Sequence, residues 1–448
     1  MSVIKSKNII AMICLLSMLH TLSLSAFASL LFELSGSYHL TGYGARGKGM
    51  GSAFTAIADD ATAASFNPAG LVQLRRPEFS LVYRLDRRYE YADFIDIQAS
   101  NTKHPLHDND LDYFSVTLPF RLYDMDMGVT LAYQHLYDFN RHWLVNMGQQ
   151  QSLFQYIYDI DYQQSGQLSA LGFSFCLGIT PRLSLGITLN WWDDDLTKNS
   201  WRQSYHFNTT ILLNDMLYDN ERYLYEDQYA ISGFNANIGM LWEFTPGWRM
   251  GAMLKTPLHA DLTHTHIQQE FDNLINPIGQ ANVDHSENNT FSIPMSFGLG
   301  LSCQVSDNLL ITADLYHTLW DHLWIKKAHQ AKISPITGNE LKESDIDDTT
   351  QIRLGMEYLW VNREKGLAIP FRLGAYYDPV PWEKKAQDYF GLTVGSGIEL
   401  LSYQQLSLDV AYEYRWGDKS PIFNQNITPI HETLRSHQVY MSLIVYLK

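Results

Sequence analysis

Apolar and polar residues alternate one by one over long stretches of this chain. The clearest stretch runs from Ile293 to Val305, where every second residue is apolar and the residues between are mostly Ser, Gly or Gln. The same period of two returns at 183–191 and 406–416. Soluble strands average about 5–6 residues, so this pattern predicts strands long enough to cross a bilayer, with apolar side chains toward lipid and polar side chains toward a lumen.

Applied to the whole chain, the pattern predicts about fourteen strands, an even number as in other bacterial barrels. The expected fold class is therefore all-β, a transmembrane antiparallel β-barrel with an N-terminal plug. We expect its strands at 77–88, 111–121, 126–137, 166–179, 182–195, 229–244, 247–262, 289–305, 308–321, 350–361, 366–378, 388–401, 405–417 and 436–447.

The connections between these strands alternate in length. In outer-membrane barrels the periplasmic turns are short and the extracellular loops are long. Tight turns are expected at Tyr123-Asp124, Thr180-Pro181, Thr245-Pro246, Ser306-Asp307, Asn362-Arg363 and Tyr403-Gln404. The long polar segments are 89–110, 138–165, 196–228, 263–288, 322–349, 379–387 and 418–435.

Aromatic residues near the strand ends predict the interfacial belt of a membrane barrel. Packing in an ordinary protein core is the alternative, but a soluble fold would have to cover many long strands on both faces. The residues expected in the belt are Tyr133, Trp191, Trp242, Trp248, Tyr358, Trp360 and Trp416.

Residues 1–28 have the three parts of a secretory signal peptide. Lys5 and Lys7 form a basic start, 9–24 is apolar, and the Ala-Phe-Ala of 26–28 is a small-x-small cleavage site. An uncleaved anchor is the alternative, but the apolar stretch is shorter than the ~20 residues of a spanning helix and contains Ser17, His20 and Ser23. We therefore expect export through a cleaved signal peptide to the bacterial outer membrane.

The segment after the signal is rich in Gly and Ala. Small residues let the backbone pack closely in a confined space, and the segment closes with the turn residues Asn67, Pro68, Ala69 and Gly70. We interpret 29–76 as a plug, or hatch, in the lumen of a barrel formed by 77–448.

At these residues the chain resembles the FadL-type family, the outer-membrane transporters of long-chain fatty acids and other hydrophobic compounds. The hatch of that family has a similar Gly/Ala run ending in Asn-Pro-Ala-Gly. Two further stretches are similar to the family: the strand-turn-strand at 293–323 and the sequence Arg-Leu-Gly-Ala-Tyr-Tyr-Asp-Pro-Val at 372–380. The C-terminal sequence Tyr446-Leu447-Lys448 differs from the family pattern, because such barrels usually end in an aromatic residue. The difference affects how the assembly machinery would recognise this C-terminus, and it does not affect the prediction of a barrel.

The resemblance implies passive, non-enzymatic uptake of hydrophobic compounds such as long-chain fatty acids, by binding, hatch movement and lateral diffusion into the membrane. The solute would leave sideways at a kinked strand. The matching strand here is 127–137, where we expect Gly128 to weaken strand pairing and form the lateral gate. Two alternatives stay open: a structural or adaptor barrel without transport, and an outer-membrane enzyme, although no Ser, His and Asp show a readable catalytic spacing.

Eight charged residues occupy inward positions of the predicted strands. Charges of both signs inside a closed wall need partners, on the wall, on the hatch or in water. We expect them to hold the hatch as structural salt bridges, with direct substrate contact as the alternative. They are Glu243, Asp314, Arg353, Glu357, Arg372, Asp409, Glu413 and Arg415.

Net charge and composition limit the kinds of molecule that this protein is expected to bind. A net charge of −16 argues against nucleic-acid binding. The expected partners are a hydrophobic small molecule, outer-membrane lipid and lipopolysaccharide, and we expect a monomer without cofactor or metal. Cys176 and Cys303 face opposite sides of the wall in the predicted register, so we expect them to be unpaired.

Two other motifs have simple explanations. The Gly-Lys-Gly-Met-Gly sequence at 47–51 lacks the preceding strand and the trailing Lys-Ser/Thr of a phosphate loop. His259, His264 and His266 with Asp261 could share one strand face and hold a metal, but we interpret them as solvated loop histidines.

Overall fold

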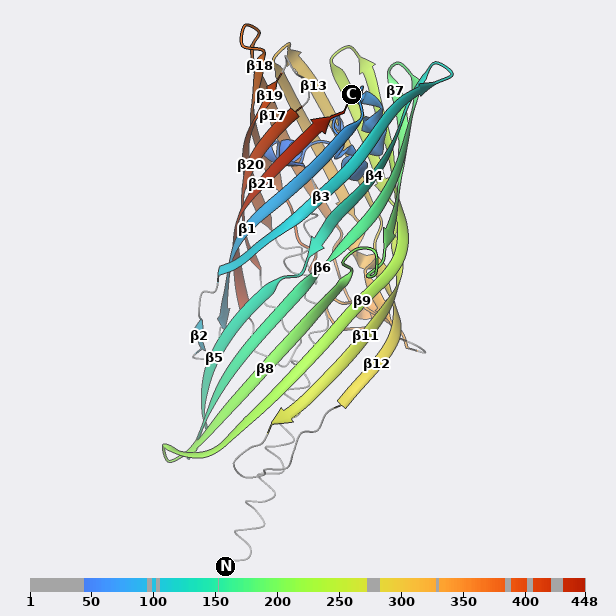
Figure 1. The fold of residues 1–448 in the computed structure, drawn as a ribbon. Coiled ribbons are helices and arrows are strands. Elements are labelled where there is room, and N and C mark those ends of the chain that lie inside the picture. Colours follow the sequence, from blue (N-terminus) through green and yellow to red (C-terminus); the bar gives the residue numbers. More distant parts are fainter. Residues whose placement is uncertain are drawn as a thin grey trace, which may run out of the picture.

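The computed structural model describes residues 44–94, 99–101, 105–151, 153–271, 283–327, 330–382, 388–400, 406–419 and 430–447. Fourteen antiparallel strands of this part form a closed barrel (Figure 1), because β21 pairs with β1 from Glu78 opposite Tyr446 to Phe94 opposite Ile430. The predicted fold class is confirmed. The barrel strands are β1 (Glu78–Phe94), β3 (Pro105–Leu122), β4 (Met125–Asp138), β6 (Phe154–Thr180), β7 (Leu183–Trp192), β9 (Met216–Thr245), β10 (Trp248–Lys255), β13 (Ser296–Ser306), β14 (Leu309–Thr318), β17 (Thr349–Asn362), β18 (Leu367–Tyr377), β19 (Tyr389–Leu400), β20 (Leu406–Lys419) and β21 (Ile430–Tyr446).

Two barrel strands continue far beyond the others. β6 has 27 residues and β9 has 30, and their outer halves pair with further strands to form a sheet that projects from the barrel (Figure 1), here called the arm. The expectation of loops at 138–165 and 196–228 is therefore wrong, since most of both segments is strand. The other strands of the arm are β5 (Arg141–Gln151), β8 (Ser200–Leu213), β11 (Leu258–Phe271) and β12 (Val283–Ile293).

Two predicted strands are each divided at a proline. Pro257 separates β10 from β11, and Pro294 separates β12 from β13. Proline has no N–H for the ladder, and both strands break at the same height: β10 pairs with β13, while β11 pairs with β12. The remaining connections contain β2 (Ala99–Asn101), β15 (Trp324–Lys326), β16 (Lys332–Ile333), η2 (Trp320–His322) and η3 (Leu341–Glu343). The turn expected at Tyr403-Gln404 lies outside the described residues.

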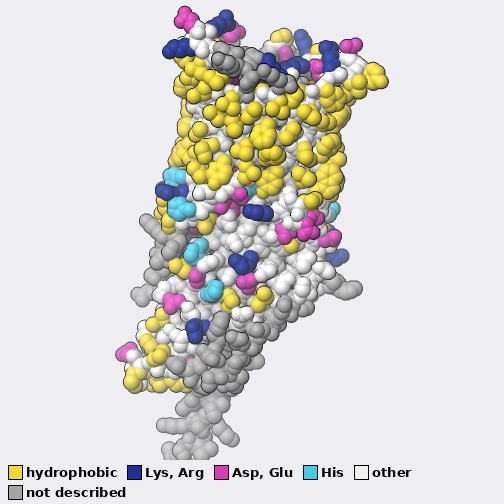
Figure 2. All heavy atoms as spheres, viewed as in Figure 1, with side chains coloured by type: hydrophobic (Ala, Val, Ile, Leu, Met, Phe, Trp, Pro, Cys, Tyr) yellow, Lys and Arg dark blue, Asp and Glu magenta, His cyan; other side chains and the backbone are white. Residues whose placement is uncertain are grey.

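Apolar side chains form a band around the end of the barrel that carries the tight turns (Figure 2). Leu299, Leu354 and Phe371 are exposed by 54–55% on its outer surface. Polar and charged side chains replace them toward the arm (Figure 2), as expected where a membrane barrel leaves the bilayer. Of the aromatic residues predicted for the belt, those exposed on the outside are Trp191, Trp242, Trp248, Tyr358 and Trp360. In the part of the chain that the structure describes, no helix has the length and hydropathy to cross a membrane.

The plug lies inside the barrel at the height of the apolar band (Figure 1). Its elements are the short helices α2 (Ala45–Gly49), α3 (Ala63–Phe66) and η1 (Pro68–Gln73), and residues 44–71 are almost all buried. The expected signal peptide and residues 29–43 of the expected hatch lie outside the described residues. Cys176 and Cys303 are free thiols.

Candidate functional site

The Asn67 side chain joins three backbone segments. Its Oδ1 accepts a hydrogen bond from the N–H of Ala69 at 3.2 Å, which closes the turn. Its Nδ2 donates to the carbonyl oxygens of Thr55, in the plug, and Met240, in β9, at 2.8 and 2.9 Å. Asn67 is fully buried, so these bonds satisfy a side chain that has no access to water and fix the end of the plug to the wall.

Pro68 and Gly70 have separate roles in the same turn. Pro68 occupies the first position of η1, where its missing N–H costs nothing. A Cβ on Gly70 would lie 2.0 Å from the carbonyl oxygen of Ala58, so only glycine fits. The Asn-Pro-Ala-Gly sequence thus permits the chain to fold back on itself inside the lumen.

A series of glycines on the inner wall, here called the glycine ring, receives the backbone of the plug. At each of its positions a Cβ would approach a plug atom to 3.1 Å or less, nearer than side chains normally allow. The sequence pattern treats these glycines only as the non-apolar half of each strand, so it misses their common role. The glycine ring comprises Gly186, Gly239, Gly251, Gly300, Gly355, Gly374 and Gly395.

Four of the eight predicted lumen charges contact the plug directly. Oδ2 of Asp314 accepts hydrogen bonds from the N–H groups of Phe54 and Thr55, both at 2.9 Å. The guanidinium of Arg353 donates to the carbonyl oxygen of Ser52 at 3.4 Å. The other two, Glu357 and Glu413, pair with Arg46 at 2.9 Å and with Lys48 at 3.7 Å, respectively.

The remaining predicted charges pair within the wall. Arg372 donates to Glu357 at 2.6 Å and also binds Asp409, so Glu357 shares its two oxygens between wall and plug. Arg415 pairs with Asp378 at 3.1 Å. Glu243 lies near the tight-turn end, half-buried, with Arg249 at 3.8 Å.

Sequence reasoning missed a second buried group of charges, on β1, β3 and β4. Its centre is Arg84, which is fully buried. Arg84 pairs with Asp112 at 3.0 Å, with Asp108 at 3.0 Å and with Asp138 at 3.1 Å. The sequence does contain a signal for this group. Alternate positions of β1 are Val82, Arg84, Asp86 and Arg88, and a strand face with three charges cannot point toward lipid, so these side chains must face the lumen.

The strand expected to be kinked is irregular, but not at Gly128. Gly128 is paired on both sides, with Pro119 in β3 and with Cys176 in β6. The irregularity lies further along β4, where a bulge at Leu136 interrupts pairing with β6 between His135 and Tyr137. A Cβ on Gly128 would lie 3.2 Å from the sulfur of Cys176, so glycine permits close packing here and does not break the ladder.

The ladder between β3 and β4 ends at Tyr113 opposite Gln134. Beyond this pair, residues 105–112 of β3 pair only with β1, and residues 135–138 of β4 pair only with β6; we call this separation the β3–β4 seam. The plug binds the last pair of the ladder. The Tyr113 hydroxyl donates to the carbonyl oxygen of Ala61 at 2.6 Å, and the Ser65 hydroxyl donates to Oε1 of Gln134 at 2.5 Å.

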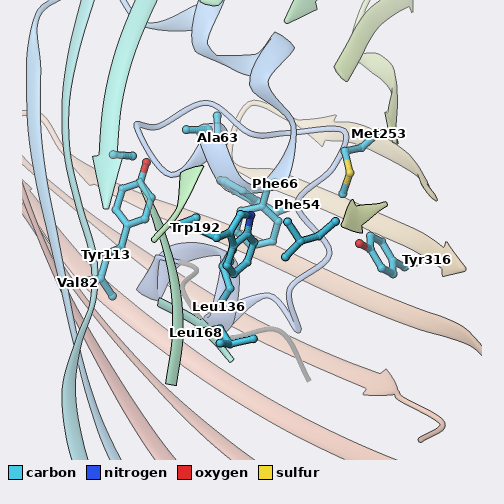
Figure 3. Close-up of a cluster of buried hydrophobic side chains, with 14 of the residues drawn as sticks. Phe54, Ala63, Phe66, Val82, Tyr113, Leu136, Leu168, Trp192, Met253 and Tyr316 are labelled. Carbon is cyan, nitrogen blue, oxygen red and sulfur yellow. The ribbon is translucent and has the colours of Figure 1, made fainter. Parts of the chain in front are cut away.

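Apolar side chains fill the lumen between the plug and the seam (Figure 3). Phe66 of the plug belongs to one buried cluster with Leu136, Leu168 and Trp192 of the wall, all exposed by 4% or less. These side chains, here called the lumen cluster, pack against one another, so the surroundings at this place in the lumen are apolar.

The histidine cluster lies on strands of the arm, not in loops. Nε2 of His264 and Nδ1 of His266 both lie 2.8 Å from Oδ1 of Asp227. The hydrogen bond between His266 and Asp227 raises the pKa of His266, although its partial burial opposes the shift. Burial would raise the pKa of Glu287, but hydrogen bonds from Lys327 and His264 lower it to about 2. His259 and Asp261 take no part in this cluster, and among the described residues no group of His, Cys, Asp and Glu could hold a metal ion.

The comparisons with known proteins agree with this architecture. A family model described as outer membrane protein transport protein (OMPP1/FadL/TodX) matches residues 30–441. The chain belongs to this family. None of the curated protein sequences matches it.

Solved structures of the OMPP1/FadL/TodX family share the fold. A Pseudomonas aeruginosa FadL homologue is similar with a TM-score of 0.60 and 13% identity, covering 90% of this chain and 98% of its own. The Pseudomonas putida toluene transporter TodX has a TM-score of 0.55 and 14% sequence identity, and the match covers 92% of this chain and 99% of TodX. The Ralstonia pickettii toluene transporter TbuX has a TM-score of 0.53 and 15% sequence identity, and the match covers 92% of this chain and 100% of TbuX. The family assignment places the protein in the bacterial outer membrane as a transporter of hydrophobic compounds.

Proposed function

We propose that this protein takes up hydrophobic compounds such as long-chain fatty acids passively, by binding in the lumen cluster and lateral diffusion into the outer leaflet. The observation that carries the proposal is the make-up of the lumen cluster: it joins Phe66 of the plug to Leu136, which lies in the bulge of β4 beside the β3–β4 seam. An apolar solute bound there stays out of water, which would cost about 0.8 kcal/mol per CH₂ group.

The closed wall and the bound plug support a lateral route. The plug is in backbone contact with the glycine ring and makes ion pairs and hydrogen bonds with the wall through Asp314 and Glu357. Passage through the tight-turn end would require breaking these contacts together. A route through the seam leaves them in place, so hatch movement would be limited to the part of the plug next to Tyr113 and Gln134.

The solute class rests on chemistry and on relatives. TodX and TbuX are toluene transporters. The lumen cluster here combines aromatic and aliphatic side chains, which suits an alkyl chain as well as an aromatic ring. We also propose cleavage of residues 1–28, contact of the wall with outer-membrane lipid and lipopolysaccharide, a monomeric state and no catalytic activity.

A structural or adaptor role is the second candidate, favoured by the far end of the arm. Leu153, Met216, Leu217 and Tyr218 are exposed there by 40–71%, well outside the apolar band (Figure 2). Exposed apolar side chains at such a distance from lipid fit a protein partner.

Uptake in a host lacking its own fatty-acid transporter tests the proposal. Cells expressing the protein should accumulate a labelled long-chain fatty acid, and Trp192→Asp should abolish the gain by placing a charge in the lumen cluster. Toluene uptake, measured in parallel, distinguishes the two solute classes. Normal surface expression without uptake of either compound would refute transport and favour the adaptor role.

A further inference from the structure

Basic side chains on the outer surface of β1 and β21 lie directly beside the apolar band. The two strands pair along their whole length, with Leu85 opposite Val439 and Arg87 opposite His437. On the outward face of β1, Leu85 is exposed by 36% and is followed by Arg87, which is also exposed. Figure 2 shows histidine and basic side chains at this margin of the band, on the side where Figure 1 places β1 and β21.

The register brings a second arginine next to the first. Arg435 of β21 is exposed and lies opposite Tyr89, the next outward residue of β1 after Arg87. Arg87 and Arg435 are therefore diagonal neighbours on one face of the sheet, at a separation of about 7–8 Å that long side chains span. We call Arg87, Arg435 and His437 the margin patch.

Aromatic rings of β20 surround the histidine of the margin patch. The Tyr414 ring lies 4.9 Å from the His437 ring, and the Tyr412 hydroxyl lies 2.7 Å from Nδ1 of His437. Trp416 lies opposite Arg435 in the ladder between β20 and β21. Tyr and Trp concentrate at the boundary between the hydrocarbon core and the headgroups of a bilayer, so the margin patch lies at the level of the lipid headgroups.

The two arginines of the margin patch have no carboxylate within 4.0 Å in the part of the chain that the structure describes. Arg75, which is also exposed, does have such a partner, because it contacts Asp126 at 3.1 Å. Asp418 of β20 lies further from the band, opposite Thr433. In a chain with a net charge of −16, two guanidinium groups without a carboxylate make a local positive surface that attracts an anion.

The surroundings of the margin patch favour a lipid as the source of that anion. On the membrane side, Tyr83, Met441 and Val410 lie in one row across β1, β21 and β20 and are exposed by 37–49%. An occupant that fits both surfaces has acyl chains directly beside an anionic group. Guanidinium groups bind phosphate through two parallel N–H···O bonds, so phosphate is the anion that suits the two arginines best.

The margin patch lies on the side of the apolar band away from the tight turns. Tight turns of outer-membrane barrels face the periplasm, so this side of the band meets the outer leaflet. Lipopolysaccharide, the phosphorylated lipid of that leaflet, combines acyl chains with phosphate groups at the headgroup level. Free phosphate or an acidic protein segment would leave the adjoining apolar row without a partner.

We propose that the margin patch binds a phosphate group of lipopolysaccharide, with Arg87 and Arg435 as its charged ligands and His437 as a hydrogen-bond partner. The acyl chains of the bound lipid lie on the apolar face of β1, β20 and β21. This site goes beyond the general lipid contact proposed above, because it assigns residues and a chemical group, and it does not depend on uptake. A lipid held there fixes the height of these strands in the membrane.

Native mass spectrometry of lipid retention tests the site. Detergent-purified protein is incubated with diphosphoryl lipid A or with the same lipid after enzymatic removal of its phosphates. The wild type should retain the diphosphoryl form about tenfold better. Arg87→Gln together with Arg435→Gln should abolish this preference, because the phosphate ligands are lost while the apolar surface stays. Preference at the wild-type level in this double variant would overturn the proposal.

Arg363→Gln together with Lys365→Gln is the matched control. Both residues are exposed in the turn between β17 and β18, at the opposite end of the barrel. This control removes the same amount of charge and should keep the preference for diphosphoryl lipid A. An equal loss in the control and in the margin-patch variant would show an effect of net charge alone and would overturn the proposal.

Inorganic phosphate distinguishes the source of the bound group. Added at the same molar excess as the lipid, it should not displace diphosphoryl lipid A, and displacement would show an anion site without specificity for lipid. Wild-type protein that retains both forms of lipid A equally would refute the site and leave the general lipid contact in place. No transport is measured, so failure of the uptake function does not change these outcomes.

The heat-dependent gel shift of a closed barrel gives a second reading. Diphosphoryl lipid A should raise the temperature at which the shifted band of the wild type disappears, because a ligand bound to the folded state stabilises it. It should not raise that temperature for the double variant, and an equal rise in both proteins would overturn the proposal. If the double variant shows no shift before heating, Arg87→Gln alone takes its place.

Discussion

Gly374 of β18 touches Gly51 of the plug so closely that a Cβ on Gly374 would lie 2.0 Å from the amide nitrogen of Gly51. Gly51 itself has a φ of +64°, a conformation that favours glycine. The same segment is held by Thr393, whose hydroxyl accepts from the Gly51 N–H at 2.9 Å and donates to the carbonyl oxygen of Gly49 at 3.0 Å. The plug and wall therefore fit at backbone level, and a single methyl group cannot enter.

Gly374→Ala should displace the plug without unfolding the barrel. The added methyl group meets plug backbone, which cannot move aside as a flexible side chain can. Planar-bilayer conductance should rise severalfold over wild type. Gly298→Ala is the matched control, because it also faces inward but meets the Tyr316 side chain at 3.0 Å. The same conductance in both variants would contradict the role of the glycine ring.

Replacing Asn67 by Ala together with Pro68 by Gly should loosen the end of the plug. Asn67→Ala removes three hydrogen bonds, and the loss of its donor to the buried carbonyl oxygen of Thr55 costs about 1–3 kcal/mol if that group stays unsatisfied; the bond to Met240 is only partly buried. Fatty-acid uptake should change while surface expression and the heat-dependent gel shift stay as in wild type. Unchanged uptake would refute the role of the turn in the hatch.

Deleting residues 29–71 should leave a folded but leaky barrel. A closed barrel of fourteen strands is wide enough to need filling, and the described part of this segment occupies the lumen. Single-channel recordings should show a large, steady conductance to small ions. A near-zero conductance in a deletion variant that still shows the gel shift would mean that the segment does not occlude the pore.

The stability of the arm should depend on pH through His266 and Glu287. The pKa of His266 is raised, so its contribution to stability is complete below its unfolded value, near 6.5, and is lost as pH rises through the folded value. The pKa of Glu287 is lowered to about 2, so its contribution is present above its unfolded value, near 4.5, and is lost as pH falls toward about 2.

Limited proteolysis of the arm measures this dependence. Cleavage in β9 and β11 should increase between neutral and alkaline pH in wild type, and His266→Gln should remove that increase by making the arm equally susceptible at both values. His206→Gln, at an exposed position of β8, is the control and should behave as wild type. An arm whose cleavage does not vary with pH in wild type would contradict the role of His266.

The spanning strands could be predicted because lipid imposes the same rule on each of them. The expected 350–361 corresponds to β17 (Thr349–Asn362), and 366–378 corresponds to β18 (Leu367–Tyr377). Beyond the bilayer both faces of a strand meet polar surroundings or aromatic neighbours, so the alternation of apolar and polar residues weakens. For this reason the sequence pattern predicts loops where the structure has the β5–β6 and β8–β9 hairpins.

The plug and its site could be predicted only in part. The Asn-Pro-Ala-Gly turn was visible because its residues restrict the backbone locally. The glycine ring was not, because it arises when seven strands from different parts of the sequence face one segment. Gly128 shows the limit of reasoning from residue type, because a glycine in a strand can either weaken pairing or permit a close contact. Here Gly128 is paired on both sides and permits the close contact with the sulfur of Cys176.

Strand β9 is long enough to extend well beyond the membrane. At about 3.3 Å per residue, a strand of 30 residues extends about 100 Å, whereas the hydrocarbon core of a bilayer is about 30 Å thick. The turn at Asn214 and Asp215, both with positive φ, joins β8 to β9 at the far end of the arm (Figure 1). Because the long connections of outer-membrane barrels are extracellular, we expect an antibody, a bacteriophage or a secreted protease to meet this hairpin before it meets the barrel. A peptide inserted there should then be displayed to the medium, far from the route of the solute.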